Sequence, residues 1–108
     1  MDRERISFFE NKLELEPDNI FYRFSLGQVL FEQKIFEVAL PHFQKCVESK
    51  PDWLIAHMFL AKSEIELKNY SSARSSLTKA INLAEEQNHE TPLEEAEGLL
   101  SDIARFIT

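Results

Sequence analysis

Two stretches of the chain, 34 residues apart, carry the same pattern of residues. Residues 16–27 read EPDNIFYRFSLG and residues 50–61 read KPDWLIAHMFLA. In both, a Pro-Asp pair follows a charged residue, and the apolar run after it ends in Leu and a small residue. Because self-similarity at a fixed period of this length is typical of stacked supersecondary units, the fold is restricted to an array of similar pieces.

Apolar residues recur at intervals of three and four almost throughout the chain, and sustained alternation is missing. This pattern predicts helices and no strands, at about 2–16, 18–33, 36–49, 53–67, 70–84 and 91–107. The last helix is predicted from Thr91-Pro92-Leu93-Glu94, which has the order of an N-cap, a first-turn proline and a capping-box glutamate. The predicted fold class is therefore all-α.

The charge balance restricts the class of partner. Twelve Lys and Arg against nineteen Asp and Glu leave a formal net charge of −7, which repels phosphate backbones and anionic membrane surfaces. We therefore expect no nucleic acid and no membrane among the partners. The single cysteine, Cys46, cannot form an internal disulfide, and the N-terminal residues are charged too often for a signal peptide, so we expect a cytoplasmic protein.

The two units align residue by residue when 18–51 is placed over 52–85. The aligned pairs are Leu26-Gly27 with Leu60-Ala61, Phe36 with Tyr70, Ala39 with Ala73, Phe43 with Leu77, and Cys46 with Ala80. At these residues the chain resembles the tetratricopeptide repeat (TPR) family. The resemblance implies a right-handed superhelical stack of antiparallel helix hairpins, in which small residues let helices approach closely. We expect one domain over 1–108, with a leading helix (1–17), two repeats (18–51 and 52–85) and a C-terminal capping helix (91–108).

Several positions depart from the family pattern. Arg23 and His57 stand where a large apolar residue is usual, and Glu64 stands where the family has an aromatic or aliphatic one. Lys34 and Lys68 occupy the hairpin turns, where the family usually has Gly. These departures concern how the helices stack and leave the repeat period unchanged.

The first helix of each repeat is apolar on two sides. On a wheel of 3.6 residues per turn, one stripe serves the packing of the repeat and a second stripe lies opposite. In the resembling family this second side lines a concave groove, so its residues become the candidate partner-binding set. The predicted binding residues are Phe21, Phe24, Gln28, Phe31, Ile55, Met58, Phe59 and Lys62.

Three interpretations of this second stripe remain open. The first or last helix covers it as ordinary core, a second copy of the chain covers it, or it binds a peptide or helix of a partner protein with apolar anchors. Family members that grip the carboxylate end of chaperones use Lys, Asn and Arg in the groove, whereas this chain has Phe24, Gln28 and Phe59 there. The predicted function is therefore protein–protein interaction in an apolar groove, with a self-associating scaffold as the alternative.

Catalytic and metal chemistry find little support in the sequence. His42 and Cys46 lie one helical turn apart, but a structural zinc needs four ligands and no matching pair is present. Gly27 and Gly98 are isolated within predicted helices and do not form a phosphate-binding loop. We predict a non-enzymatic protein with no catalytic residues, no metal and no cofactor.

Overall fold

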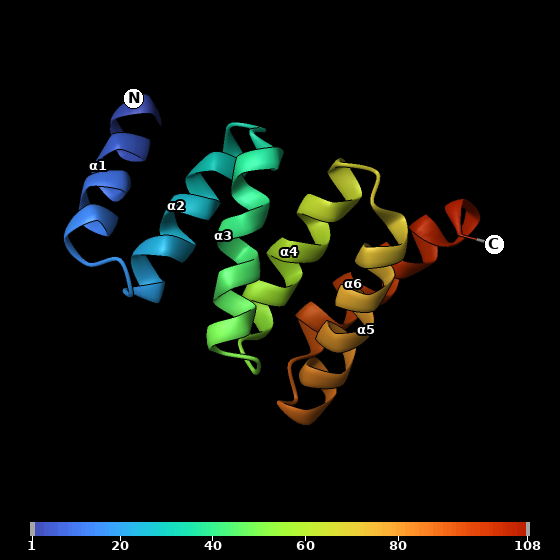
Figure 1. The fold of residues 1–108 in the computed structure, drawn as a ribbon. Helices are drawn as coiled ribbons and strands as arrows, with labels where there is room; N and C mark the ends of the chain where they lie inside the picture. Colours follow the sequence, from blue (N-terminus) through green and yellow to red (C-terminus); the bar gives the residue numbers. More distant parts are fainter. Residues whose placement is uncertain (1, 108) are drawn as a thin grey trace.

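The computed structural model describes residues 2–107, so Met1 and Thr108, the two ends of the predicted domain, lie outside the described residues. The described part contains six α-helices and a short 3₁₀ helix. They are α1 (Asp2–Leu15), α2 (Ile20–Glu32), α3 (Phe36–Ser49), α4 (Leu54–Glu66), α5 (Tyr70–Glu86), α6 (Glu90–Ile103) and η1 (Ala104–Phe106). The helices follow one another across the molecule in chain order, with α1 at one end and the last helical turns at the other (Figure 1). The all-α prediction is confirmed.

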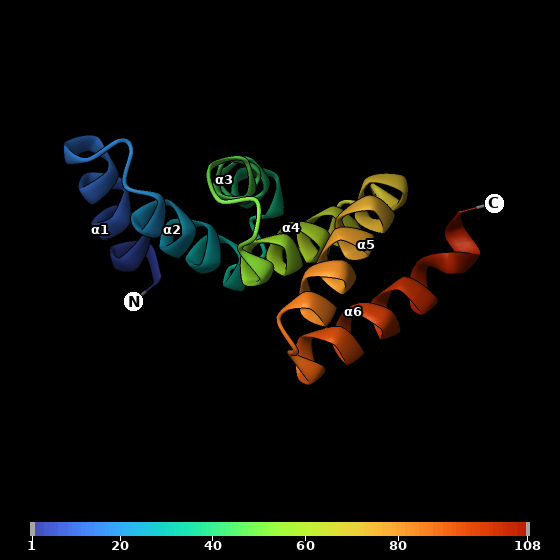
Figure 2. The same ribbon diagram turned by 90° about the horizontal axis from the view of Figure 1, so that it is seen from below.

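The helices stack as antiparallel pairs. α2 packs against α3 and α4 packs against α5, and these two hairpins meet where α3 lies against α4. α1 packs on α2 at one end, and α6 packs on α5 at the other. Seen from below, α3 lies on one side of the row formed by α2 and α4 (Figure 2). α2 and α4 are therefore the first helices of their hairpins, and they lie on the same side of the stack.

Three helices end in the same hydrogen-bonded turn. After α2, Lys34 has φ 63, its N–H donates to the Phe31 carbonyl, and Ile35 N–H donates to the Leu30 carbonyl at 2.9 Å. Lys68 after α4 and Asn88 after α5 repeat this left-handed geometry, with φ 64 and 57. This arrangement is the Schellman motif, which closes the free carbonyls of a helix end and reverses the chain.

The third of these turns also moves the start of the last helix. α6 begins at Glu90 with His89 as its N-cap residue, so the prediction of an N-cap at Thr91 is wrong. His89 N–H donates to the Ala84 carbonyl at 2.9 Å and closes the turn, which leaves no room for a linker up to Thr91. Pro92 is then the third helical residue, where its missing N–H removes no helix hydrogen bond.

The small residues lie where the helices approach each other most closely. Five of the small residues aligned between the two repeats have no exposed surface, namely Ala39, Cys46, Ala61, Ala73 and Ala80. Gly27 of α2 faces the ring of Phe43, and a Cβ placed on it would lie 2.8 Å from Phe43 Cε1. The close approach that the sequence predicts at these positions is therefore present.

The polar residues at usually apolar positions make hydrogen bonds within the stack. Arg23 Nη2 donates to the Pro17 carbonyl at 3.2 Å, and Arg23 Nη1 lies 3.1 Å from His42 Nδ1. His57 is buried, and its Nε2 donates to the Pro51 carbonyl at 2.8 Å. Because burial disfavours the charged imidazolium, the pKa of His57 is lowered despite this hydrogen bond.

Glu64 is a buried carboxyl group at a repeat position that is usually apolar. Ser76 of α5 donates its hydroxyl to Glu64 Oε1 at 2.6 Å, which joins the two helices of the second hairpin. Burial raises the pKa of Glu64, and the Ser76 hydrogen bond opposes that change only in part. The second repeat therefore replaces an apolar contact with a hydrogen bond.

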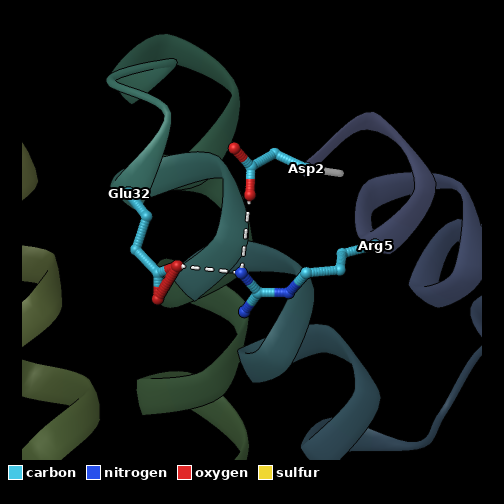
Figure 3. Close-up of polar contacts among 3 residues, drawn as sticks. All are labelled: Asp2, Arg5 and Glu32. Atoms are coloured by element: carbon cyan, nitrogen blue, oxygen red, sulfur yellow. Dashed lines mark hydrogen bonds and ion pairs between the residues drawn. The ribbon is translucent and has the colours of Figure 1, made fainter.

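An exposed ion-pair group joins α1 to the end of α2. Arg5 Nη1 lies 3.3 Å from Glu32 Oε2 and 3.6 Å from Asp2 Oδ1 (Figure 3). All three side chains are about half exposed, so each pair contributes no more than about 1 kcal/mol. The attachment of α1 therefore depends mainly on its apolar face, in which Ile6, Phe9 and Leu13 pack against the core.

Candidate functional site

Aromatic rings join the first repeat to the second. Phe59 of α4 stacks on Phe43 of α3 with ring centroids 5.2 Å apart. It also meets Phe24 and Phe31 of α2 edge-on, at 5.6 and 5.4 Å. We call these four residues the aromatic junction. Aromatic pairs in such geometries stabilise contacts beyond the area they bury, so the junction holds α2, α3 and α4 together.

Three of the predicted binding residues thus have a structural role. Phe24, Phe31 and Phe59 are half-buried and pack against the core of the first repeat. The structure brings them together on neighbouring helices, as the two-stripe pattern indicates. Each of them leaves part of its surface accessible, and the remainder is used in stacking.

Met58 lies elsewhere. It is 2% exposed and belongs to the core beneath α4, α5 and α6, together with Leu54 and Ala61. Its place on the second stripe is covered by the chain's own packing, because the last helix lies against α5 and reaches α4. Met58 therefore presents no surface to a partner.

Two of the exposed large apolar residues lie at the N-terminal ends of α2 and α4. Phe21 is 60% exposed and Ile55 is 43% exposed. Between them, the half-buried Trp53 meets Phe21 with ring centroids 5.6 Å apart and meets Phe24 at 4.7 Å. We call Phe21, Trp53 and Ile55 the aromatic shelf. The shelf continues the aromatic junction out to the surface.

Sequence reasoning missed Trp53 as part of this surface. In the first repeat, Asn19 caps α2, and its side chain accepts hydrogen bonds from the N–H groups of Phe21 and Tyr22 at 3.0 Å. Trp53 is the N-cap residue of α4 and makes no such bond. A side-chain cap contributes about 1 kcal/mol, and tryptophan cannot supply one. A tryptophan at the position aligned with Asn19 was therefore the signal in the sequence that this side chain serves another purpose.

A pocket of about 170 Å³ lies beside the shelf, where the N-terminal ends of α4 and α6 meet. Trp53 and Ile55 form part of its wall, and Gln87 after α5 and Pro92 of α6 form another part. Gln87 Nε2 donates to the Asp52 carbonyl at 3.0 Å, which joins the turn after α5 to the loop before α4. Ile55 is the predicted binding residue that lines this pocket.

The two polar members of the predicted set are placed differently. Lys62 Nζ lies 2.6 Å from Glu95 Oε2 of α6 and 5.4 Å from the centre of the Phe59 ring. Gln28 of α2 is half-buried. Lys62 therefore connects α4 to the last helix in the isolated chain.

Comparison with known proteins identifies the family. The family model described as Regulator of microtubule dynamics protein 1-3 matches residues 8–104. The chain belongs to this family. No curated protein sequence is significantly similar to this family member.

Solved structures show the same fold as this family member. The tetratricopeptide repeat domain protein of Salinibacter ruber has 24% identity and a TM-score of 0.71, covering 82% of this chain and 89% of that one. A protein of Bordetella parapertussis has 25% identity and a TM-score of 0.79, covering 93% and 87%. The TPR2B domain of yeast Sti1, solved in complex with pHsp70, has 20% identity and a TM-score of 0.82, covering 93% and 80%. The resemblance to the TPR family is confirmed as a TPR-like stack.

This fold is generally a protein-interaction module, and domains of this kind are typically non-catalytic. Within residues 2–107 of the family member, no group of three or more His, Cys, Asp and Glu side chains is placed to hold a metal ion. Burial raises the pKa of the Cys46 thiol to about 11, so this thiol stays protonated at neutral pH. Among the described residues, no helix combines the length and apolar character of a membrane span.

Proposed function

We propose that this chain binds a segment of a partner protein on the side of the stack shared by α2 and α4. The aromatic shelf of Phe21, Trp53 and Ile55 provides the exposed anchor surface. The accessible parts of the neighbouring side chains extend it, namely those of Phe24, Gln28, Phe31, Phe59 and Lys62. Met58 is left out of the binding surface because it is buried.

The exposure of Phe21 and Ile55 is the observation that carries the proposal. Full burial of one such side chain contributes about 1.5–3 kcal/mol, and Phe21 leaves 60% of its surface in water. The Phe21 ring meets the half-buried Trp53, and Trp53 and Ile55 line the same pocket, which supports one connected apolar area. A continuous patch of this kind marks a surface for association, whereas single exposed apolar residues do not.

Selection from an unbiased library of displayed peptides tests the proposal. We expect peptides with apolar anchors to be enriched on the wild-type chain and to bind the double variant Phe21→Ser/Ile55→Ser at least about tenfold more weakly. The matched control is Phe8→Ser/Val38→Ser, which changes two residues of similar exposure on α1 and α3. Equal binding to both double variants, or no enrichment at all, contradicts the proposal.

Self-association through the same shelf is the alternative. A shelf that binds a second copy would bury Phe21 and Ile55 without any other partner. Sedimentation equilibrium separates the two functions, because a chain that stays monomeric at high micromolar concentration cannot be a scaffold of this kind. A dimer that dissociates in Phe21→Ser/Ile55→Ser would replace peptide binding as the function of the shelf.

The family description suggests which partner is involved. Members are described as regulators of microtubule dynamics, so we propose that the bound segment belongs to a cytoplasmic protein that takes part in this regulation. The chain would act by holding that protein. Adding the purified chain to cytoplasmic extract and measuring microtubule growth rates tests this role. An effect that survives in Phe21→Ser/Ile55→Ser would show that another surface is responsible.

A further inference from the structure

The aromatic shelf already carries a cation from the chain itself. Lys50, in the loop before α4, places its Nζ 5.2 Å from the centre of the Phe21 ring and 5.8 Å from that of Trp53. A cation within about 6 Å of a ring centre is attracted by the electron-rich face of the ring. One ammonium group therefore lies within reach of two rings at once, and one of these rings is mostly exposed.

We infer that the partner segment carries a lysine or arginine, and that its cation lies on Phe21 and Trp53 in the place that Lys50 occupies in the isolated chain. This inference depends on the proposed function, because it specifies the chemistry of the segment bound at the same shelf. The site combines two rings with an apolar neighbour, Ile55. A partner segment with a basic side chain next to an apolar anchor fits both the rings and Ile55.

The charge around the shelf favours a basic segment. The last helix, α6, contains no Lys or Arg and carries Glu90, Glu94, Glu95, Glu97 and Asp102. Its N-terminal end lines the pocket next to Trp53 and Ile55. A partner that runs from the shelf towards α6 therefore approaches a helix whose charged side chains are all acidic, Glu95 among them being paired with Lys62. Such a helix attracts cations and repels anions.

The basic residues of α2 and α4 are held by other groups of the chain. Arg23 is held by the Pro17 carbonyl and by His42, within the first hairpin. Lys62 is paired with Glu95 at 2.6 Å, which neutralises it. Lys50 is thus the residue of the isolated chain whose cation lies on the shelf, and it is an exposed loop residue.

Replacing Lys50 on the rings requires little energy. An exposed cation–aromatic contact is weak, and Lys50 regains full hydration when it moves into water. A partner cation held over the same rings by neighbouring apolar contacts loses less freedom on binding than an unattached one. The isolated chain therefore protects the shelf with a weak contact that a basic segment can exchange.

Trp53 is the only tryptophan of the chain, so its fluorescence reports directly on the shelf. The probes are the peptides enriched on the wild-type chain, each made again with arginine replaced by citrulline, its neutral isostere, or with lysine replaced by norleucine. In buffer of physiological ionic strength, we expect each neutral peptide to bind about two- to fivefold more weakly than its basic parent. The basic peptides should also change the Trp53 emission more strongly.

Two variants locate the effect on the rings. Phe21→Leu keeps an apolar side chain but removes one ring, so the basic parents should lose about two- to fivefold in affinity while the neutral peptides change little. Lys50→Met removes the internal cation and should tighten binding of the basic parents only. Lys79→Met on α5 makes the same change in net charge at another exposed position and should leave both kinds of peptide unaffected.

The outcomes distinguish this inference from the proposed function. Enriched peptides without Lys or Arg, or basic peptides that bind as well after neutralisation, overturn the inference and leave peptide binding at the shelf intact. If Lys50→Met and Lys79→Met change peptide affinity equally, the change comes from net charge alone, and this result also overturns the inference. The absence of any enriched peptide overturns the proposed function and the inference with it.

Discussion

Two lysines of the hairpin turns adopt a backbone conformation that suits glycine. Lys34 and Lys68 have φ of 63 and 64, in the left-handed region where a Cβ crowds the following carbonyl oxygen. The turns form nevertheless, because each closes two hydrogen bonds of a Schellman motif. The hairpins therefore keep this turn geometry although lysine makes it less stable than glycine would.

Replacement of these lysines by glycine should stabilise the chain. We expect Lys34→Gly and Lys68→Gly each to raise the free energy of unfolding by about 0.5–1 kcal/mol, after the greater freedom of glycine in the unfolded chain is subtracted. Urea denaturation followed by circular dichroism measures the change. Lys45→Gly, inside α3, is the matched control and should destabilise by about 1 kcal/mol. Destabilisation in all three variants would contradict this account of the turns.

Glu64 makes the stability depend on pH. Burial raises its pKa above the ordinary value of 4.5, so the folded chain holds this proton more strongly than the unfolded chain. Stability contributed by the group is therefore lost as pH rises from about 4.5 through the raised folded value. Glu64→Gln removes the titration and keeps an oxygen that can accept from Ser76.

We therefore expect Glu64→Gln to be more stable, relative to wild type, near pH 7.5 than near pH 4. The comparison of urea unfolding at the two pH values isolates Glu64, because His57 and the other titrating groups are present in both proteins. A stability difference between the two proteins that does not change with pH would show that Glu64 titrates equally in the folded and unfolded states.

At the scale of single helices, the two glycines have opposite surroundings. A Cβ on Gly27 would lie 2.8 Å from the Phe43 ring, whereas a Cβ on Gly98 meets nothing within 4 Å. Phe43 is fully buried, so its ring cannot move aside without disturbing the aromatic junction. Both glycines lie within helices, where alanine is intrinsically favoured.

The same substitution should therefore change stability in opposite directions. Gly27→Ala should destabilise the chain by about 1–3 kcal/mol, since it overfills a packed contact. Gly98→Ala should stabilise it by about 0.5–1 kcal/mol through helix propensity alone. Thermal unfolding of the two variants beside wild type measures both effects. Stabilisation in Gly27→Ala would mean that the contact of α2 with α3 is looser than the structure shows.

Prediction from sequence succeeded where a pattern repeats and failed where a single contact decides. The 34-residue period and the aligned small residues indicated the helices and their stacking, because such positions depend on backbone approach alone. Met58 was misplaced because its burial depends on how α6 reaches over α4. Trp53 was missed because its contact with Phe21 crosses between repeats. Lys50 was missed because its contact with Phe21 joins opposite ends of the first repeat, which no local spacing reveals.

Across the whole molecule, the helices form two core clusters that share α4. One cluster contains Leu26, Phe43 and Leu60 around the first hairpin, and the other contains Leu77 and Ile103 beneath α5 and α6. Stacked repeats bury their apolar faces only against neighbours, so their stability is close to a sum of unit and interface contributions. A change at one interface should then loosen the nearest units more than distant ones.

Phe59 and Ile103 offer a reciprocal test, since Phe59 belongs to the aromatic junction and Ile103 anchors α6. We expect each alanine variant to lose roughly 2–4 kcal/mol of stability, as large-to-small changes in packed sites do. Phe59→Ala should speed amide hydrogen exchange mainly in α2 and α3, and Ile103→Ala mainly in α5 and α6. The exposed Phe8→Ala is the control and should change neither pattern. Equal loss of protection in every helix for both variants would mean that the stack opens as one cooperative unit, so that a partner bound at the shelf would stabilise α6 as much as α2.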